Sequence, residues 1–309
     1  MENLIVDKTN GSVSYNDELH KYWVTGSNQF CTSVTTLINK FTTFDQEFWS
    51  KYKALERIVP EDKFKKMKTS LLKNKKITQE ILDEYGVNSE ELNSVTEVVL
   101  EEWKEKGKTA TDRGTKIHKD YEMSVLSKQY ELVKGFGDFI NNDAQLIENN
   151  TIKAGNYVLP ELLISRVSDD GYLRIAGQAD LVIVEGNKFK VLDFKTNKEI
   201  KQKSYYDNRR KKYETMKYPL SHLHDTNFWH YTLQLSIYAW MIEKNNPDLK
   251  LDGLFILHHD HDDVKTVYEC EYLKTDVENL LKFYKKDVMY QEFLQRNKPW
   301  TELKYTKEH

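Results

Sequence analysis

Cysteine is scarce in this sequence: Cys31 and Cys270 are its two thiols among 309 residues. Two cysteines so far apart do not make a disulfide framework, so we expect a reducing compartment and two ordinary packing residues. Apolar runs are also short, and none reaches the roughly 18 residues that a membrane-spanning helix needs. The N-terminus lacks a basic region followed by an apolar core, which argues against a signal peptide. We therefore expect a cytoplasmic protein without a membrane partner.

Neither sign of charge dominates, because 46 lysines and arginines nearly balance 49 acidic residues and leave a net charge of −3. This balance argues against a protein that coats nucleic acid over its whole surface, although a local basic groove remains compatible with it. The phosphate-binding pattern G-x-x-x-x-G-K-[ST] is absent, which excludes a helicase motor of that type. Charged residues make up 31% and hydrophobic residues 39%, as is typical of a globular chain with a large core.

The clearest pattern that is present is a series of strands between residues 157 and 197. Runs of β-forming residues are separated by the turn signals S-D-D-G and G-N. We predict strands over residues 157–167, 172–176, 180–185 and 189–194.

Three acids interrupt these apolar runs: Glu161, Asp180 and Asp193. Lys195 follows Asp193 by two residues and therefore lies on the same face of its strand. Taken alone, Asp193 and Lys195 favour the interpretation as a surface ion pair worth less than about 1 kcal/mol. Asp180 and Asp193 occur in the runs A-D-L-V-I-V and V-L-D-F-K, however, where a carboxylate is costly unless it is paired or binds a cation. Such a set of oxygen ligands suits a hard metal ion.

The order of these motifs resembles the core of the PD-(D/E)XK nuclease superfamily, in particular its RecB-like exonuclease branch. G-Q-A-D at residues 177–180 and V-L-D-F-K-T at residues 191–196 carry the resemblance. Two further motifs of that branch occur in the expected order, R-G-T-K-I-H at residues 113–118 and Q-L-S-I-Y at residues 234–238. The resemblance implies an α/β fold with a restriction-endonuclease-like core, in which a central mixed β-sheet is flanked by helices.

The resemblance also implies roles for individual residues. The implied catalytic residues are Lys195, Asp193, Asp180, Glu161, Gln234 and Tyr238. The implied metal ligands are His118, Glu161, Asp180, Asp193 and the backbone carbonyl of Phe194. Ordinary structural roles remain open for three of them: a satisfied helical histidine at His118, a surface acid at Glu161 and a buried backbone-capping amide at Gln234. The implied cofactor is Mg²⁺ or Mn²⁺, and two cysteines are too few for the four-cysteine iron–sulfur cluster of many relatives.

A basic stretch follows the last of these strands, over residues 198–217, and tyrosines are interleaved with its charges. Cations beside aromatic rings suit single-stranded nucleic acid, since phosphates meet the cations and bases stack on the rings. A flexible charged loop is the competing interpretation. The residues expected to contact DNA are Arg113, Thr115, Thr196, Tyr205, Tyr206, Arg209, Arg210, Lys211 and Lys212.

We expect a single nuclease domain over residues 1–309. It would comprise an N-terminal hairpin and helix (residues 1–43), a helical insertion (44–108) and the nuclease core (109–309). The helical pattern over residues 78–107 is expected to end at Gly107. The hairpin, with His20 and Tyr22, and the string S-V-T-T-L-I after it resemble the N-terminal module of phage-encoded nucleases and of mitochondrial single-strand exonucleases. An ordinary hairpin followed by a helix that the Thr32 or Ser33 hydroxyl caps is equally compatible with these residues. The string H-H-D-H-D-D at residues 258–263 matches no standard zinc site and is interpreted as a polar turn.

These features together predict a metal-dependent DNA nuclease, most simply an exonuclease on DNA ends or single strands. The resemblance to phage-encoded nucleases implies a role in phage DNA recombination, repair or replication in the cytoplasm of a bacterial host. The partners would be DNA with a free end or a single strand, and phage recombination or replication proteins. Two alternatives remain: a structure-specific or sequence-specific endonuclease of the same fold, and a non-catalytic DNA-binding protein on a nuclease scaffold.

Overall fold

A computed structural model describes residues 8–9, 12–127, 136, 147–148, 151–208 and 210–296. The chain divides into two compact units, one made of residues 1–42 and 117–309 and the other of residues 43–116. The second unit is helical. It contains α2 (Gln46–Ile58), α3 (Glu61–Asn74), α4 (Gln79–Tyr85) and the first part of α5 (Ser89–Leu126). Its core is built around Phe48, Leu55 and Met67, so the aromatic residues at helical spacing in α2 are core residues.

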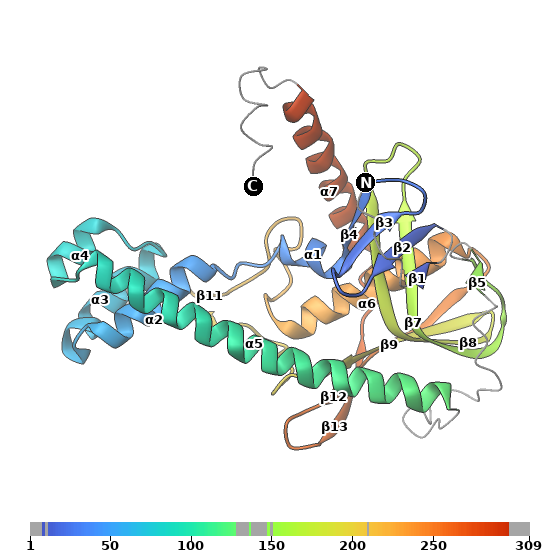
Figure 1. Ribbon diagram of the computed structural model, residues 1–309, viewed down its shortest axis with the longest axis horizontal. Helices are drawn as coiled ribbons and strands as arrows, with labels where there is room; N and C mark the ends of the chain where they lie inside the picture. Colours follow the sequence, from blue (N-terminus) through green and yellow to red (C-terminus); the bar gives the residue numbers. More distant parts are fainter. Residues whose placement is uncertain are drawn as a thin grey trace. The chain divides into compact units, whose positions relative to one another are not determined.

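The first unit is built on a mixed β-sheet whose order is β1-β2-β3-β4-β8-β9-β12-β13, with β7 paired to β8 (Figure 1). Its strands are β1 (Lys8–Thr9), β2 (Val13–Asn16), β3 (Lys21–Val24), β4 (Phe30–Ser33), β7 (Gly155–Val167), β8 (Arg174–Gly186), β9 (Lys188–Lys195), β12 (Lys250–His259) and β13 (Lys265–Cys270). Two small hairpins accompany it, β5 (Ile147–Glu148) with β6 (Thr151–Ile152), and β10 (Tyr206–Asp207) with β11 (Lys212–Tyr213). The predicted α/β fold with a central mixed sheet is confirmed.

Strand β8 is the longest-paired strand of the sheet, and it changes neighbours along one edge. Its other edge pairs with β7 in antiparallel fashion over almost its full length. On the changing edge, β4 pairs in parallel with Ile175 and Ala176, and β9 begins its antiparallel pairing at Leu181. Residues 177–180, the G-Q-A-D motif, therefore lie where β8 passes from one neighbour to the other.

Helices cover the sheet because their apolar residues have to be buried. Helix α6 (Asn227–Asn245) is apolar nearly all round and packs against β7, β9 and β12. Helix α1 (Val34–Asn39) begins at Ser33, whose hydroxyl accepts a hydrogen bond from the Thr36 backbone N–H, as the sequence predicts for a capping residue. The last turns of α5 place Tyr121 and Val125 in a second apolar cluster with β8 and β9 residues. Helix α7 (Lys274–Arg296) closes the unit and contacts α6.

Three local predictions differ from the structure. Strand β8 is continuous through Gly177, where two separate strands are expected, because β7 pairs with it without interruption on either side of that position. Helix α5 runs through Gly107 instead of ending there, since one exposed glycine costs only about 1 kcal/mol relative to alanine. His258 and His259 are the last residues of strand β12, so the polar turn begins only at Asp260. Among the helices described here, none is long and apolar enough to cross a membrane.

Candidate active site

The three acids that interrupt the apolar runs lie side by side on neighbouring strands. Pro160 pairs with Leu181 and Leu162 with Ala179, so Glu161 of β7 lies opposite Asp180 of β8. Leu181 pairs with Leu192, and the same antiparallel register brings Asp180 next to Asp193 of β9. The register of the sheet therefore assembles residues that are up to 32 positions apart in the sequence.

His118 joins the two carboxylates Glu161 and Asp180 from the C-terminal part of α5. One ligand atom from each of the three residues lies within 4.8 Å of the others. The His118 ring is held on both sides: Nε2 donates to the Phe194 carbonyl oxygen at 2.9 Å, and Nδ1 lies 3.5 Å from Asp180 Oδ1. One turn further along α5, Tyr121 stacks on the Phe194 ring with 4.3 Å between the ring centroids. This packing fixes α5 on the strand that carries the site.

Glu161 adopts a backbone conformation that is uncommon in a strand. Its φ of 49° lies in the left-handed region, which costs a residue other than glycine about 1–3 kcal/mol and occurs most often at functional sites. Gln178 donates a hydrogen bond from Nε2 to a Glu161 carboxylate oxygen. The orientation of this carboxylate is thus set by both the backbone and a neighbouring amide.

Asp180 supports the site through the backbone as well. Its Oδ2 accepts a hydrogen bond of 2.6 Å from the Phe194 N–H, and the residue is 8% exposed. Because Phe194 offers its N–H to Asp180 and its carbonyl oxygen to His118, this one peptide connects β9 to both residues.

Asp193 and Lys195 form a buried ion pair beside this cluster. Asp193 is 1% exposed, and its Oδ2 lies 2.5 Å from Lys195 Nζ. Burial raises the pKa of the Asp193 carboxyl to about 6; the Lys195 charge opposes this rise and Asp180 adds to it. Burial alone would lower the pKa of Lys195, but attraction to Asp193 and Asp180 outweighs burial and holds this pKa above its ordinary value. At neutral pH the pair is therefore carboxylate and ammonium.

Gln234 and Tyr238 reach the same place from α6. Gln234 Nε2 donates to Asp193 Oδ1 at 3.2 Å and lies 3.3 Å from the Tyr238 hydroxyl. Burial raises the pKa of Tyr238 well above its ordinary value, so its hydroxyl stays protonated. The Tyr238 ring lies against Gly177, where an added Cβ would come within 2.6 Å of Tyr238 Cε1. Glycine is therefore needed in the G-Q-A-D motif to admit the ring.

The sequence interpretation missed three residues that hold Lys195 and the segment after it. The Lys195 Nζ lies over the Tyr231 ring, 4.7 Å from its centroid. The Tyr231 hydroxyl donates to Asn197 Oδ1 at 2.6 Å, and His258 Nε2 donates to the Asn197 carbonyl oxygen, also at 2.6 Å. Tyr231 precedes Gln234 by three residues and thus shares its helix face, which is a signal that the sequence does contain. His258 is found only from the parallel pairing that sets it beside Lys195.

The residues expected to contact DNA occupy several places. Tyr205 and Tyr206 expose 68% and 40% of their surface at the β10–β11 hairpin, and Lys211 and Lys212 are exposed there. Arg210 is engaged within the hairpin, by Asp207 at 2.7 Å and Glu214 at 2.5 Å. Four more residues complete this account: Thr196 directly follows β9, Arg113 and Thr115 lie on the part of α5 that belongs to the second unit, and Arg209 falls outside the described residues.

The donor set of the cluster fits a divalent metal ion. It offers two carboxylates, one imidazole and a nearby backbone carbonyl, a combination that suits Mg²⁺ or Mn²⁺ better than a thiolate-binding metal. Asp193 adjoins this set, while its own carboxylate contacts Lys195 and Gln234.

Comparison with known proteins identifies the family of the chain. A family model described as the PD-(D/E)XK nuclease superfamily matches residues 53–299, which is most of the chain. Two solved structures are similar over part of it. The crystal structure of SSO0001 is 22% identical with a TM-score of 0.25, over 48% of this chain and 56% of that one. The crystal structure of a candidate exonuclease from Eubacterium rectale is 12% identical with a TM-score of 0.29, over 42% of this chain and 43% of that one. The chain thus spans about half the length of these two proteins, and no curated protein matches it.

Proposed function

We propose, because the chain belongs to the PD-(D/E)XK nuclease superfamily, that it hydrolyses the phosphodiester bonds of DNA with Mg²⁺ or Mn²⁺ and acts as an exonuclease on DNA ends or single strands. The observation that carries this proposal is the cluster of His118, Glu161 and Asp180, whose ligand atoms lie within 4.8 Å of one another. Beside it lies Lys195, which is paired with the buried Asp193 and supplies a fixed positive charge.

The residues of the cluster would hold the metal ion, together with the Phe194 carbonyl oxygen and with Asp193. A bound divalent ion neutralises the anionic phosphate and lowers the pKa of a coordinated water. The protein's part is to fix the ligands before substrate arrives. Gln178 orients Glu161, and the Phe194 peptide orients both Asp180 and His118.

Lys195 acts as a cation in this proposal. Its ammonium group is held between the Asp193 carboxylate and the Tyr231 ring, so its direction is set in advance. From there it donates to the attacking water or to a phosphate oxygen and stabilises the charge that develops during cleavage. Gln234 keeps the Asp193 carboxylate in place at 3.2 Å, so that the lysine does not lose its partner.

The test uses the purified chain with Mg²⁺ or Mn²⁺ on linear single-stranded, linear duplex and circular single-stranded DNA. We expect degradation of linear DNA that is lost with EDTA. Lys195→Ala should lower the rate by at least about 10²- to 10³-fold, as the loss of one fixed charge donor does in other enzymes. The matched control is Lys188→Ala, because Lys188 lies on the same strand but its side chain is 61% exposed and pairs with Asp252.

The outcomes separate the alternatives. Cleavage of the circular substrate would replace the exonuclease with an endonuclease of the same fold. Binding without cleavage of any substrate would make the chain a DNA-binding protein on a nuclease scaffold. Full activity in a pure Lys195→Ala, Asp180→Ala or Asp193→Ala variant would contradict the roles given to these residues. Asp180→Asn is expected to retain DNA better, since it removes a negative charge without adding bulk.

We extend the proposal to phage DNA recombination, repair or replication in the cytoplasm of a bacterial host, because the N-terminal segment resembles that of phage-encoded nucleases. A recombination role requires long single-stranded tails, so end-labelled duplex DNA should lose one strand well before the other. Residues 44–108 are proposed as an insertion into one nuclease domain, which is consistent with a family match that starts within them at residue 53.

A further inference from the structure

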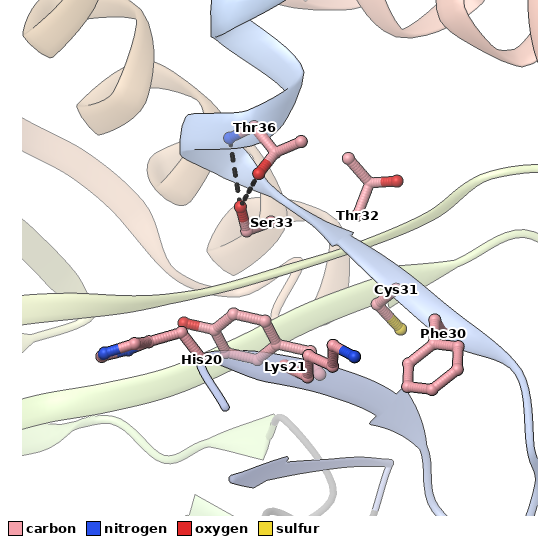
Figure 2. A pocket seen from close by; sticks show the side chains of 8 residues that line it. His20, Lys21, Phe30, Cys31, Thr32, Ser33 and Thr36 are labelled. Atoms are coloured by element: carbon pink, nitrogen blue, oxygen red, sulfur yellow. Dashed lines mark hydrogen bonds between the residues drawn. The ribbon is translucent and has the colours of Figure 1, made fainter. Parts of the chain in front are cut away.

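A pocket lies at the N-terminal hairpin, outside the metal cluster and the β10–β11 hairpin. It has a volume of about 300 Å³ and is lined by His20, Lys21, Tyr22, Phe30, Cys31, Thr32, Ser33 and Thr36. His20 directly precedes β3, and the other residues come from β3, β4 and the first turn of α1 (Figure 2). The volume is at the lower end of the range of small-molecule sites, which corresponds to one nucleotide unit rather than a longer segment.

The lining combines three kinds of chemistry. Phe30 is 53% exposed, and the Lys21 ammonium lies 5.6 Å from the centre of its ring. Figure 2 shows the two side chains beside each other at one end of the pocket. At another side the Ser33 hydroxyl bonds to Thr36, accepting from its backbone N–H at 3.1 Å. An aromatic ring, a cation and hydroxyl groups are the partners of a base, a phosphate and a sugar respectively.

The wall of the pocket is held in position by its neighbours. The Tyr22 ring stacks on Tyr15 with 4.5 Å between the centroids, and the Tyr15 hydroxyl lies 3.0 Å from His20 Nδ1. His20 keeps a left-handed φ of 48°, a conformation that costs energy and that the contact with Tyr15 helps to hold. On the far side the Thr32 hydroxyl lies 2.6 Å from the Tyr284 hydroxyl of α7. The pocket is therefore formed before any ligand is present.

The sheet connects this pocket to the metal cluster. Tyr22 pairs with Cys31 across β3 and β4, and Ser33 pairs with Ala176 across β4 and β8. Gly177 and Gln178 follow Ala176 directly, and Gln178 bonds to Glu161. Neighbouring strands are about 4.8 Å apart, so the pocket lies one strand away from the residues that hold Glu161.

We propose that this pocket binds one nucleotide of single-stranded DNA beside the nucleotide whose phosphate is cleaved, with the base on the Phe30 ring and the phosphate at Lys21. The proposal rests on the proposed nuclease function and adds a substrate subsite to it. A free phosphate would make no use of the aromatic wall, and an apolar ligand would make no use of the Lys21 ammonium.

The first test measures DNA binding without cleavage. A short fluorescent oligo-dT is titrated with the full-length protein in EDTA, and its anisotropy is followed. Phe30→Ala should weaken binding by about tenfold, within the range of one lost base stack. Lys21→Gln should reduce the slope of log K against log salt by about 0.7, which corresponds to one phosphate contact on a single strand. The matched controls are Val267→Ala and Lys265→Gln on β13, since Val267 is 54% exposed and both residues lie on a strand at the far end of the sheet order.

The second test locates the base. An oligonucleotide with 5-iododeoxyuridine is irradiated with the same protein, and the crosslinked peptide is identified by mass spectrometry. A crosslink within residues 20–36 supports the subsite, and crosslinks confined to other segments overturn it.

Turnover then separates this proposal from the proposed function. With Mg²⁺, Phe30→Ala should raise KM and leave kcat nearly unchanged. Weaker binding by Phe30→Ala in a protein that cleaves nothing would support the pocket and contradict the nuclease. Normal cleavage with identical binding by Phe30→Ala, Lys21→Gln and the controls would overturn the pocket alone. If the unaltered chain does not bind the oligonucleotide, both are wrong.

Discussion

Gly177→Ala is the substitution that tests the active-site packing most directly. An added Cβ would lie 2.6 Å from Cε1, 3.0 Å from the hydroxyl oxygen and 3.2 Å from Cζ of Tyr238. The Tyr238 ring has little room to move away, because the residue is only 3% exposed and lies on the buried helix α6. Either the helix or strand β8 has to shift.

Two opposing effects set the magnitude. Inserting a methyl group into a closely packed core typically costs about 1–3 kcal/mol. Replacing glycine by alanine within a strand recovers roughly 0.5–1 kcal/mol of backbone entropy. We therefore expect the free energy of unfolding to fall by about 1–2 kcal/mol. Cleavage should fall as well, since moving Tyr238 disturbs Gln234, which holds Asp193 at 3.2 Å.

The assay is urea unfolding of four proteins: the unaltered chain, Gly177→Ala, Tyr238→Leu and the double variant. Leucine lacks the ring atoms nearest to Gly177, so alanine should cost much less in the Tyr238→Leu background. Gly107→Ala serves as control, because no atom lies within 4 Å of the added Cβ and the site is an exposed helical position. It should stabilise by about 0.5–1 kcal/mol. An unchanged stability of Gly177→Ala, or an equal cost in both backgrounds, would refute the packing argument.

Three further predictions concern other contacts. Tyr231→Leu should lower kcat for DNA cleavage by about tenfold, because it removes the ring whose centroid lies 4.7 Å from Lys195 Nζ, and a cation over an aromatic face is worth up to about 2 kcal/mol. Tyr231→Phe keeps the ring and should lower kcat less. Equal effects of the two substitutions would show that the ring contact is unimportant. Replacing Lys211 and Lys212 by glutamine should reduce the slope of log K against log salt by up to about 1.4 for single-stranded DNA, whereas Arg210→Gln should change it less, since Arg210 already pairs with Asp207 and Glu214. The contact of Asp170 with Lys285 lowers the pKa of Asp170 to about 2. This contact therefore stabilises the fold at pH values above the ordinary carboxyl pKa, and the stabilisation is lost as the pH falls through about 2. Lys285→Met should lower the free energy of unfolding at pH 6 more than at pH 2, and an equal loss at both pH values would contradict this.

Much of the fold follows from local patterns in the sequence. Alternating β-formers and turn signals place the strands near residues 157–167 and 189–194. These predictions succeed because periodicity and turn chemistry act over a few residues. The continuity of β8 through Gly177 depends on neighbouring strands that lie elsewhere in the sequence. The continuity of α5 through Gly107 depends on the small energetic cost of one glycine in a helix. Neither can be read from a short stretch of sequence.

The candidate site was predictable only as a set of residue types. The motifs name Glu161, Asp180 and His118, and the sheet register and α5 bring these three together. The sequence did not show which carboxylates lie together, since Asp193 contacts Lys195 and Gln234 and these contacts join β9 to α6. His258 was missed for the same reason, because its contact with Asn197 is formed only by the fold. Tyr231 could have been inferred from the helix face that it shares with Gln234, but its contact with Lys195 could not.

The parallel pairing of β4 with β8 has a consequence for the synthesis of the chain. Thr32 and Ser33 cannot pair with Ile175 and Ala176 until those residues have been synthesised, about 140 residues later. At roughly 5–20 residues per second, the N-terminal hairpin spends on the order of 10–30 s with the edge of β4 unpaired. That edge belongs to a strand of only four residues, and short edge strands are poor templates for association with other chains. The shortness of β4 thus protects the nascent protein until its partner strand arrives.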